Sequence, residues 1–374
     1  MQNKVVLSGV GLWTPPHAIT NEELIDSYNA YADHFNEINQ AQISAGTLQA
    51  KPHSSAEFVE KASGIKSRYI YSKDGVLDIH RMRPIIQERS DDELSQQAEI
   101  AVEAAKAALK AANKTAADID AVIVSCAYTQ RSYPAIAIEV QEALGIEGFG
   151  FDMLVACSAA TFGMHRAYEM VAAGTARAVL VINPELVSPQ VNYTDRDSHF
   201  IFGDVATATV IENAETATGD HVFNLLSTKA VTKFSSNIRS NFGYMTHATD
   251  KDPYGADKLF HQEGRKVFKE VCPMAAEHIT AHLASHDLQP ADLKRWWLHQ
   301  ANINMNTLIS KKLLGREVTK EEAPIVLDTY ANTASAGSVI AFALHHKDLV
   351  AGDYGLLCSF GAGYSIGSLL VQKR

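Results

Sequence analysis

The run Val155-Ala156-Cys157-Ser158-Ala159-Ala160-Thr161-Phe162-Gly163 carries an apolar, strand-like segment into the first turn of a predicted helix. The small side chains of Ala159, Ala160 and Gly163 allow neighbouring backbones to approach closely. A helix start offers unpaired N–H groups and a partial positive charge, and both favour thiolate over thiol at Cys157. A lone buried cysteine is more often an inert small side chain. The run by itself therefore leaves both interpretations of Cys157 open.

The bulk composition describes an ordinary large protein. The chain has 374 residues, of which 46% are hydrophobic and 20% charged, enough for one large core or two. Its net charge of -10 argues against a nucleic-acid partner. No apolar run is long enough for a membrane span, and the first residues lack the apolar region and cleavage site of an export signal. We therefore expect a cytoplasmic protein with no membrane partner.

The cysteines exclude two kinds of site. Cys126, Cys157, Cys272 and Cys358 lie far apart and match neither a zinc nor a disulfide spacing. In the cytoplasm their default state is the free thiol. We expect no metal site and four free thiols.

Two halves of the chain repeat one pattern of elements, with residues 1–218 and 219–374 as the predicted units. In the first half we predict a helix from Leu94 to Ala112 behind a Ser90/Glu93 capping box, a strand at 121–124, a helix at 134–144 ended by Gly145, and a strand at 207–211. In the second half we predict a helix at 257–285, a strand at 296–298, a helix ended by Gly315, and a strand at 366–371 opened by Phe360-Gly361-Ala362-Gly363. This repetition predicts an internal duplication with a boundary near Thr216 to His221, and a mixed sheet with helices on both sides.

Two stretches fit neither half. Residues 31–55 are polar and weakly periodic, and residues 75–89 carry several Arg and Ile side chains. Both read as insertions. Long loops in compact enzymes often form lids or substrate walls, and the alternative is surface decoration.

Two polar residues far downstream change the interpretation of Cys157. His299 closes the strand at 296–298, where a side chain emerges from the sheet edge into a crevice, and Asn332 begins Asn332-Thr333-Ala334-Ser335. Taken alone, the histidine would be interpreted as a structural residue and the asparagine as a turn residue. Cysteine, histidine and asparagine together provide a nucleophile, a base-type group and an amide donor, which indicates acyl transfer through a covalent thioester.

Two further motifs give weaker evidence about function. Phe360-Gly361-Ala362-Gly363 opens a strand and not a helix, so we reject a dinucleotide site there. A tight backbone that directs an N–H at a developing oxyanion is a better use of it. His278, His282 and His286 share one predicted helix face, but no partner completes a ligand set, so we expect a solvated face.

Taken together, these residues resemble the ketoacyl-ACP synthase III family of thiolase-like condensing enzymes, and the match covers most of the chain. Its anchors, in order, are Ala156-Cys157-Ser158, Thr194-Asp195-Arg196, Phe202-Gly203-Asp204, His299-Gln300-Ala301-Asn302, Asn332-Thr333 and Phe360-Gly361-Ala362-Gly363. The resemblance implies an α/β, five-layered αβαβα fold of two related halves, usually a homodimer. It also implies that an acyl primer is loaded on Cys157 and condensed with malonyl-ACP, with release of carbon dioxide in fatty acid biosynthesis.

The resemblance assigns roles to several residues. Cys157, His299 and Asn332 are catalytic, and the backbone N–H groups of Cys157 and Ala362 form the oxyanion hole. No resident cofactor is implied, because coenzyme A and acyl carrier protein (ACP) thioesters are substrates. Acyl carrier protein is the expected partner.

The binding residues depart in part from the family pattern. Phe58 stands where the family often has a tryptophan that stacks on adenine, Ala62 and Asn304 stand where it has arginines, and Arg196 is retained. Adenine could still lie between Phe58 and Arg196. The expected carrier-docking residues are Lys269, Lys311 and Lys312, and Tyr133 matches a loop that caps the partner subunit's acyl pocket.

The primer and the reaction type leave alternatives. The insertions and the chain length favour a medium-chain primer such as octanoyl, carried on coenzyme A or ACP. A non-decarboxylating or polyketide-type condensation would use the same fold. A catalytically silent acyl-binding partner is a further alternative, against which the retained Cys157, His299 and Asn332 argue.

Overall fold

The computed structural model describes residues 4–374, so the first three residues used in the export prediction lie outside this range. In chain order the strands are β1 (Val5–Trp13), β2 (His17–Thr20), β3 (Ser67–Ile70), β4 (Ala121–Cys126), β5 (Phe149–Leu154), β6 (Ala178–Glu185), β7 (Val205–Asn213), β8 (Phe223–Ser235), β9 (Ile238–Arg239), β10 (His261–Gln262), β11 (Leu293–Leu298), β12 (Tyr354–Gly361) and β13 (Gly363–Lys373). The helices are α1 (Asn21–Ile38), α2 (Gln40–Ser44), α3 (Ala56–Ser63), α4 (Gln96–Ala112), α5 (Ile136–Leu144), α6 (Ala159–Ala172), α7 (Tyr244–His247), α8 (Gly264–Ala284), α9 (Ile303–Leu314), α10 (Leu327–Tyr330) and α11 (Gly337–Leu344). None of these helices is long and apolar enough to cross a membrane.

The main sheet contains the same strand arrangement twice. Its order is β11-β12-β13-β8-β1-β7-β6-β4-β5. From β4 through β6 and β7 to β1 the pairings are parallel, antiparallel and antiparallel, and from β11 through β12 and β13 to β8 they repeat in that sequence. The two sets meet where β1 pairs with β8 through only two residue pairs. The topology is therefore that of two related halves, and β5 extends the first of them.

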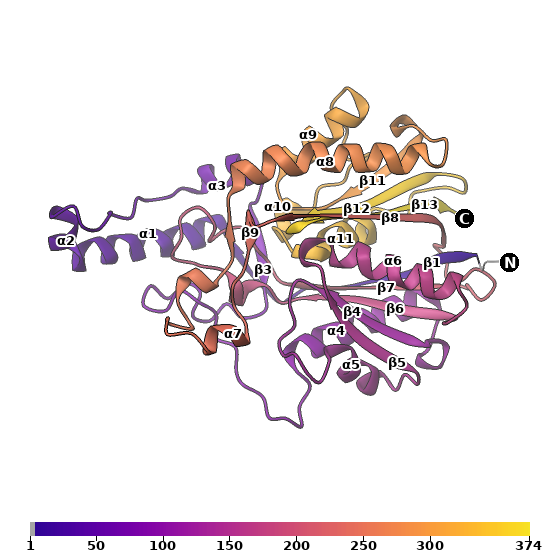
Figure 1. Ribbon diagram of the computed structural model, residues 1–374, viewed down its shortest axis with the longest axis horizontal. Coiled ribbons are helices and arrows are strands. Elements are labelled where there is room, and N and C mark those ends of the chain that lie inside the picture. The colour runs from indigo at the N-terminus through magenta and orange to yellow at the C-terminus, as the bar shows by residue number, and fades with distance from the viewer. Residues whose placement is uncertain (1–3) are drawn as a thin grey trace.

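The helices complete five layers, which Figure 1 shows stacked from α4 and α5 to α8 and α9. Because side chains alternate across a strand, Val122 faces the cluster of α4 and α5, whereas Ile123 faces a central cluster with α6 and α11. On β12, Leu357 joins that central cluster and Leu356 packs under α8 and α9. The predicted αβαβα fold of two halves is confirmed.

Several boundaries differ from the predictions, and three of them have a clear physical reason. The helix predicted from Leu94 begins at Gln96, because the Ser95 side chain accepts the N–H of Ala98 as its cap. Ser90 and Glu93 close a separate turn upstream. The helix predicted from residue 257 begins at Gly264, since the backbone before it bonds elsewhere and β10 pairs with β9. The Phe360–Gly363 run is the turn between β12 and β13 and not only the start of a strand.

The two insertions pack against each other. Residues 31–38 continue α1, and α2 follows in an arm that projects from the body (Figure 1). The Ser27 hydroxyl donates to the Leu77 carbonyl at 3.0 Å, and the His34 ring contacts the His80 ring edge-on at 5.2 Å between centroids. The 31–55 insertion is thus helical over 31–38 and 40–44, and the 75–89 insertion packs against α1 at Ser27 and His34.

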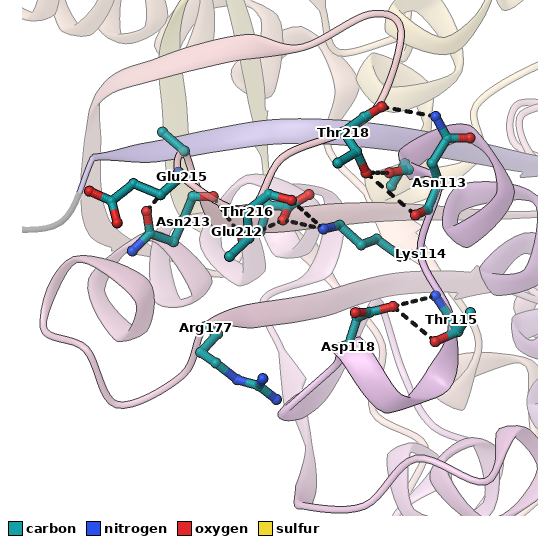
Figure 2. Close-up of polar contacts among 12 residues, drawn as sticks. Asn113, Lys114, Thr115, Asp118, Arg177, Glu212, Asn213, Glu215, Thr216 and Thr218 are labelled. Carbon is teal, nitrogen blue, oxygen red and sulfur yellow. Dashed lines mark hydrogen bonds and ion pairs between the residues drawn. The ribbon is translucent and has the colours of Figure 1, made fainter.

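The segment at the predicted boundary is tied to the end of α4 (Figure 2). The Asn113 amide donates to the Thr218 carbonyl at 2.9 Å. The buried Lys114 ammonium lies 3.0 Å from the Glu212 carboxylate, which also accepts the Thr216 hydroxyl at 2.8 Å. These contacts hold the residues before 219 to the first half, and the division into 1–218 and 219–374 stays a prediction.

Candidate active site

Cys157, His299 and Asn332 line one cavity of about 270 Å³. They come from three different places: the turn before α6, the end of β11, and the loop after α10. Most of the other lining is apolar, including Phe200, Ile201, Phe202, Ile238, Phe260, Val267, Phe268, Val271, Met305 and Phe360. The fold therefore brings the three predicted catalytic residues together at an apolar pocket.

Cys157 lies in a short turn, Ala156–Ser158, that leads directly into α6. Ala156 has a φ of 46°, a left-handed conformation that costs energy for a residue with a side chain and often marks functional sites. The Ser158 hydroxyl donates to the Ser365 carbonyl at 2.8 Å and anchors the turn to β13. A side chain on Gly361 would place its Cβ 3.0 Å from the Cys157 sulfur, so the end of β12 also fixes the cysteine.

The Cys157 thiol is protonated at neutral pH. Burial raises its pKa to about 12, and the negative charge of Glu185 raises the pKa further in the same direction. Hydrogen bonds from the backbone N–H groups of Ala362 and Cys157 itself lower the pKa but do not offset burial. The prediction that the helix start favours the resting thiolate is therefore wrong in its net direction. The same two N–H groups are the predicted oxyanion-hole donors, and they reach the sulfur.

Hydrogen bonds hold the backbone and Oδ1 of Asn332, and among residues 4–374 no partner holds its amide nitrogen. Its backbone N–H donates to the Ile201 carbonyl at 2.9 Å, and its carbonyl accepts the Gly203 N–H at 3.1 Å. The Asn332 Oδ1 accepts the Ala334 N–H at 3.0 Å, which leaves the side-chain NH₂ as the group available to a ligand. Ala331 and Ala334 have φ values of 57° and 48°. The loop is strained around Asn332, as is common where a side chain must be aimed.

His299 is a neutral hydrogen-bonding group. Burial lowers its pKa to about 3, so one ring nitrogen carries a hydrogen at neutral pH and the ring has no charge. The ring packs edge-on against Phe360 at 5.2 Å between centroids, and the backbone N–H of His299 donates to the Cys358 carbonyl at 2.8 Å. The Gln300 side chain bridges from the Leu298 carbonyl to the Val326 N–H and stabilises the turn that follows. A neutral imidazole suits hydrogen-bond donation.

The predicted adenine-binding pair is in direct contact. The Arg196 guanidinium lies 4.3 Å from the centre of the Phe58 ring, and its Nε donates to the His53 carbonyl at 2.9 Å. Phe58 lines the cavity. A base could stack between these two side chains only if they moved apart.

The remaining predicted binding residues are exposed and outside the cavity. Lys269 lies on α8, beside the cavity-lining Phe268, and Lys311 and Lys312 lie in the last turn of α9. Tyr133 is 77% exposed in the loop before α5. All four are free to meet another molecule.

The histidines of α8 do not form a solvated face, so that prediction is wrong. His278 and His282 are buried and bond to the Ser368 hydroxyl at 2.8 and 2.7 Å, while His282 and His286 both reach Ser227. The strand surface under α8 shields them. Among residues 4–374 no group of three or more His, Cys, Asp or Glu side chains could hold a metal.

Glu185 is a site residue that the sequence analysis missed. It ends β6, it is fully buried, and its carboxylate accepts hydrogen bonds from the loop that carries Asn332. The signal in the sequence is an acidic residue three positions after the apolar run 178–182. A carboxylate at the end of a buried strand is uncommon without a partner or a function.

Known proteins resemble this chain over most of its length. Family models described as 3-oxoacyl-[acyl-carrier-protein] synthase III and as its C-terminal part match residues 151–230 and 283–373. A beta-ketodecanoyl-[acyl-carrier-protein] synthase of Pseudomonas aeruginosa is 54% identical over 350 residues, which cover 94% of this chain and 100% of the relative. A beta-ketoacyl-[acyl-carrier-protein] synthase III of Granulibacter bethesdensis is 26% identical over 98% of both chains.

Solved structures share the fold. A 3-oxoacyl-(acyl carrier protein) synthase III from Pseudomonas aeruginosa has a TM-score of 0.76 at 20% identity, covering 99% of this chain and 98% of the other. The priming beta-ketosynthase of the R1128 polyketide pathway has a TM-score of 0.77 at 22% identity, covering 99% and 96%. With the 54% identical relative spanning nearly the whole chain, this protein belongs to the 3-oxoacyl-[acyl-carrier-protein] synthase III family and is an acyltransferase of the condensing type.

Proposed function

We propose that the protein condenses an acyl primer with malonyl-ACP in two steps at the cavity of Cys157. In the first step the Cys157 sulfur attacks the primer thioester. The backbone N–H groups of Cys157 and Ala362 stabilise the oxyanion, and the departing thiol takes the proton. One such donor typically contributes about 2.7–4 kcal/mol in the transition state. The presence of Cys157, His299 and Asn332 on one apolar cavity is the observation that carries this proposal.

In the second step malonyl-ACP loses carbon dioxide at the same cavity. The electron pair of the broken C–C bond becomes a thioester enolate, whose oxygen accepts hydrogen bonds from His299 and Asn332. The enolate carbon then attacks the acyl group on Cys157 and releases the sulfur as a thiolate, which takes a proton from water and returns to the resting thiol. Two neutral donors suit a charge that develops on oxygen. The free amide nitrogen of Asn332 and the uncharged ring of His299 support this assignment.

Two measurements test the steps separately. Cys157→Ala abolishes the acyl adduct seen by mass spectrometry. His299→Ala retains the adduct and loses carbon dioxide release from malonyl-ACP, because the histidine acts only in the second step. Equal loss of both steps would contradict the role of His299, and condensation without carbon dioxide release would favour a non-decarboxylating reaction.

The preferred primer is a medium-chain acyl group. The 54% identical relative is named for a beta-ketodecanoyl product. A ten-carbon product of a two-carbon extension requires an eight-carbon primer, so octanoyl is the expected substrate. Acyl-chain profiling of the purified protein tests this, and acetyl as the best primer by a wide margin would defeat it.

Coenzyme A is the favoured carrier of the primer. A polar cavity of about 930 Å³ adjoins the active-site cavity and shares Asp197, Phe260, Gln262 and Gly264 with it. Lys51, Arg239 and Arg265 line it. These cations can pair with phosphate oxygens, beside the carboxylates of Asp195, Asp197 and Asp257 that also line the cavity. Arg265→Ala should raise KM for octanoyl-CoA and leave KM for octanoyl-pantetheine unchanged; an equal change for both would contradict the assignment.

The protein partner is an acidic acyl carrier protein that docks beside the cavity mouth. Lys269, Lys311 and Lys312 are exposed on the two helices that supply Phe268 and Met305 to the cavity wall. Charge complementarity mainly changes the association rate. Lys269→Glu should therefore raise KM for malonyl-ACP, more strongly at low salt, and leave the turnover of a malonyl-pantetheine substrate unchanged.

The working state is a cytoplasmic homodimer. One side of β5 is unpaired within residues 4–374, and Phe149 and Leu154 on it are 48% and 56% exposed. Exposed apolar side chains on an unpaired edge strand favour association with another chain. Tyr133 lies in the loop after β4, the strand that pairs with β5, where it could reach a second copy. Light scattering tests the mass, and a dimer insensitive to Leu154→Lys would exclude this edge as the interface.

A further inference from the structure

Glu185 is a buried carboxylate without a cation. Its side chain has no Lys, Arg or His within ion-pair distance among residues 4–374. Only neutral donors satisfy it: the Ala127 N–H at 3.2 Å from both oxygens, the Ser335 N–H at 3.2 Å, and the Ser335 hydroxyl. Burying a charge costs far more than burying an amide of the same shape. A residue that only held these two segments together by hydrogen bonds would not need to be a carboxylate.

The carboxylate joins two sides of the active site. Ala127 follows β4 and packs in the same apolar cluster as Cys157. Ser335 lies in the turn whose Ala334 N–H holds the Asn332 Oδ1. Removing the carboxylate would therefore release the turn that aims the Asn332 amide at the cavity.

The charge of Glu185 also acts on the nucleophile. Its field raises the pKa of the Cys157 thiol. Burial raises the pKa of Glu185 itself to about 7, against the hydrogen bonds from Ser335 and Ala127, and the charge of Asp204 raises it slightly. The other ionisable groups within its field are Cys126 on β4 and Tyr128 in the next loop, and burial keeps both neutral by raising their pKa values.

We propose that Glu185 is a positioning residue: it fixes the Asn332 loop to the end of β4, and its carboxylate, where it is ionised, adds to the burial that disfavours a Cys157 thiolate. This inference rests on the proposed roles of Cys157 and Asn332. The two effects predict opposite changes when Glu185 is replaced. Loss of the charge should make the Cys157 sulfur more reactive, whereas loss of the hydrogen bonds to the Asn332 loop should make condensation slower.

The test compares Glu185→Gln with Ser335→Ala. The alkylation of Cys157 by iodoacetamide is followed against pH by peptide mass spectrometry, which needs no substrate. Above about pH 7, where the wild-type carboxyl is ionised, Glu185→Gln should be alkylated roughly tenfold faster, as expected for a midpoint about one pH unit lower. It should also lower kcat for condensation with little change in KM, since the Asn332 donor acts in the transition state. Ser335→Ala removes the tie but not the carboxylate, so it should lower kcat and leave the alkylation rate unchanged at high pH, where Glu185 is ionised in both proteins.

Several results would overturn the inference. An unshifted alkylation midpoint in Glu185→Gln with a wild-type melting temperature removes the electrostatic effect, and an unchanged kcat in Ser335→Ala removes the positioning effect. If Glu185→Gln does not fold, Glu185→Asp keeps the charge with a shorter reach, and it should retain the wild-type midpoint with a lower kcat. A shifted midpoint in that variant counts against the proposal. Failure of the wild-type protein to form an acyl adduct would instead contradict the proposed function.

Discussion

Because Gly361 has no side chain, the Cys157 side chain can occupy the space beside it. Adding one methyl group at Gly361 is therefore a direct test of the site. A Cβ built on Gly361 would lie 2.5 Å from the Cys157 Cβ and 3.0 Å from its sulfur. Non-bonded carbons normally stay about 3.5–4.0 Å apart, so the overlap is about 1 Å. Cys157 cannot retreat freely, because the Ser158 hydroxyl ties its turn to the Ser365 carbonyl. Overpacking of this kind costs about 1–3 kcal/mol, and a misplacement of about 1 Å can lower a rate by about 100-fold.

We therefore expect Gly361→Ala to reduce the rate of acyl loading on Cys157 by about 100-fold, with a modest fall in melting temperature. The assay is the rate of adduct formation from octanoyl-CoA by mass spectrometry. Gly243→Ala is the matched control, because a Cβ there meets no atom within 4 Å and the backbone is extended. A loading rate within a factor of about three of the wild-type rate would refute the argument that β12 positions the sulfur, since well-separated neutral substitutions change little.

Three more outcomes follow from buried groups. The low pKa values of His278 and His282, about 4 and about 3 because of burial, mean that the unfolded chain binds protons that the folded chain does not. Unfolding free energy should therefore fall as the pH drops below about 6.5, measured by urea unfolding at several pH values, and should fall less steeply in His282→Gln. Glu212→Gln leaves the buried Lys114 ammonium without its carboxylate and should cost about 3–5 kcal/mol of unfolding free energy; a loss under about 1 kcal/mol would show that the pair is dispensable. Condensation by His299→Ala should show no recovery at any pH, because the missing group is a neutral donor and not a titrating base.

The sequence predicted the elements whose signals are local. Gly145 and Gly315 end α5 and α9 in left-handed conformations, with φ values of 67° and 70°, and this is the conformation for which glycine is favoured after a helix. The start of α8 was placed too early because it depends on distant partners. The Phe260 N–H donates to the Gln190 carbonyl and the Glu263 N–H to the Asn237 carbonyl, and no local pattern contains these contacts.

The active-site residues show the same difference between local signals, which the sequence contains, and distant contacts, which it does not. Cys157 and His299 each follow a predicted strand and Asn332 reads as a turn residue, so it is their type and order that indicate a shared chemistry. The direction of the Cys157 pKa could not be read, since it depends on how many apolar side chains from other elements surround the sulfur. Glu185 was missed for a related reason. Its partners, Ala127 and Ser335, are 58 and 150 residues away.

The active site is built almost entirely from neutral groups, and this fits the order of its chemistry. The resting sulfur is a thiol, the His299 ring is uncharged, and Asn332 cannot ionise. An apolar cavity disfavours any charge that has no partner, so a thiolate or enolate is stabilised only when the donors of the backbone, His299 and Asn332 are all in reach. Charge then arises only on atoms of the bound thioester or on the sulfur that attacks it. The buried carboxylate of Glu185 opposes early ionisation of the sulfur, and a site of this kind gains reactivity from substrate binding and not from a preformed nucleophile.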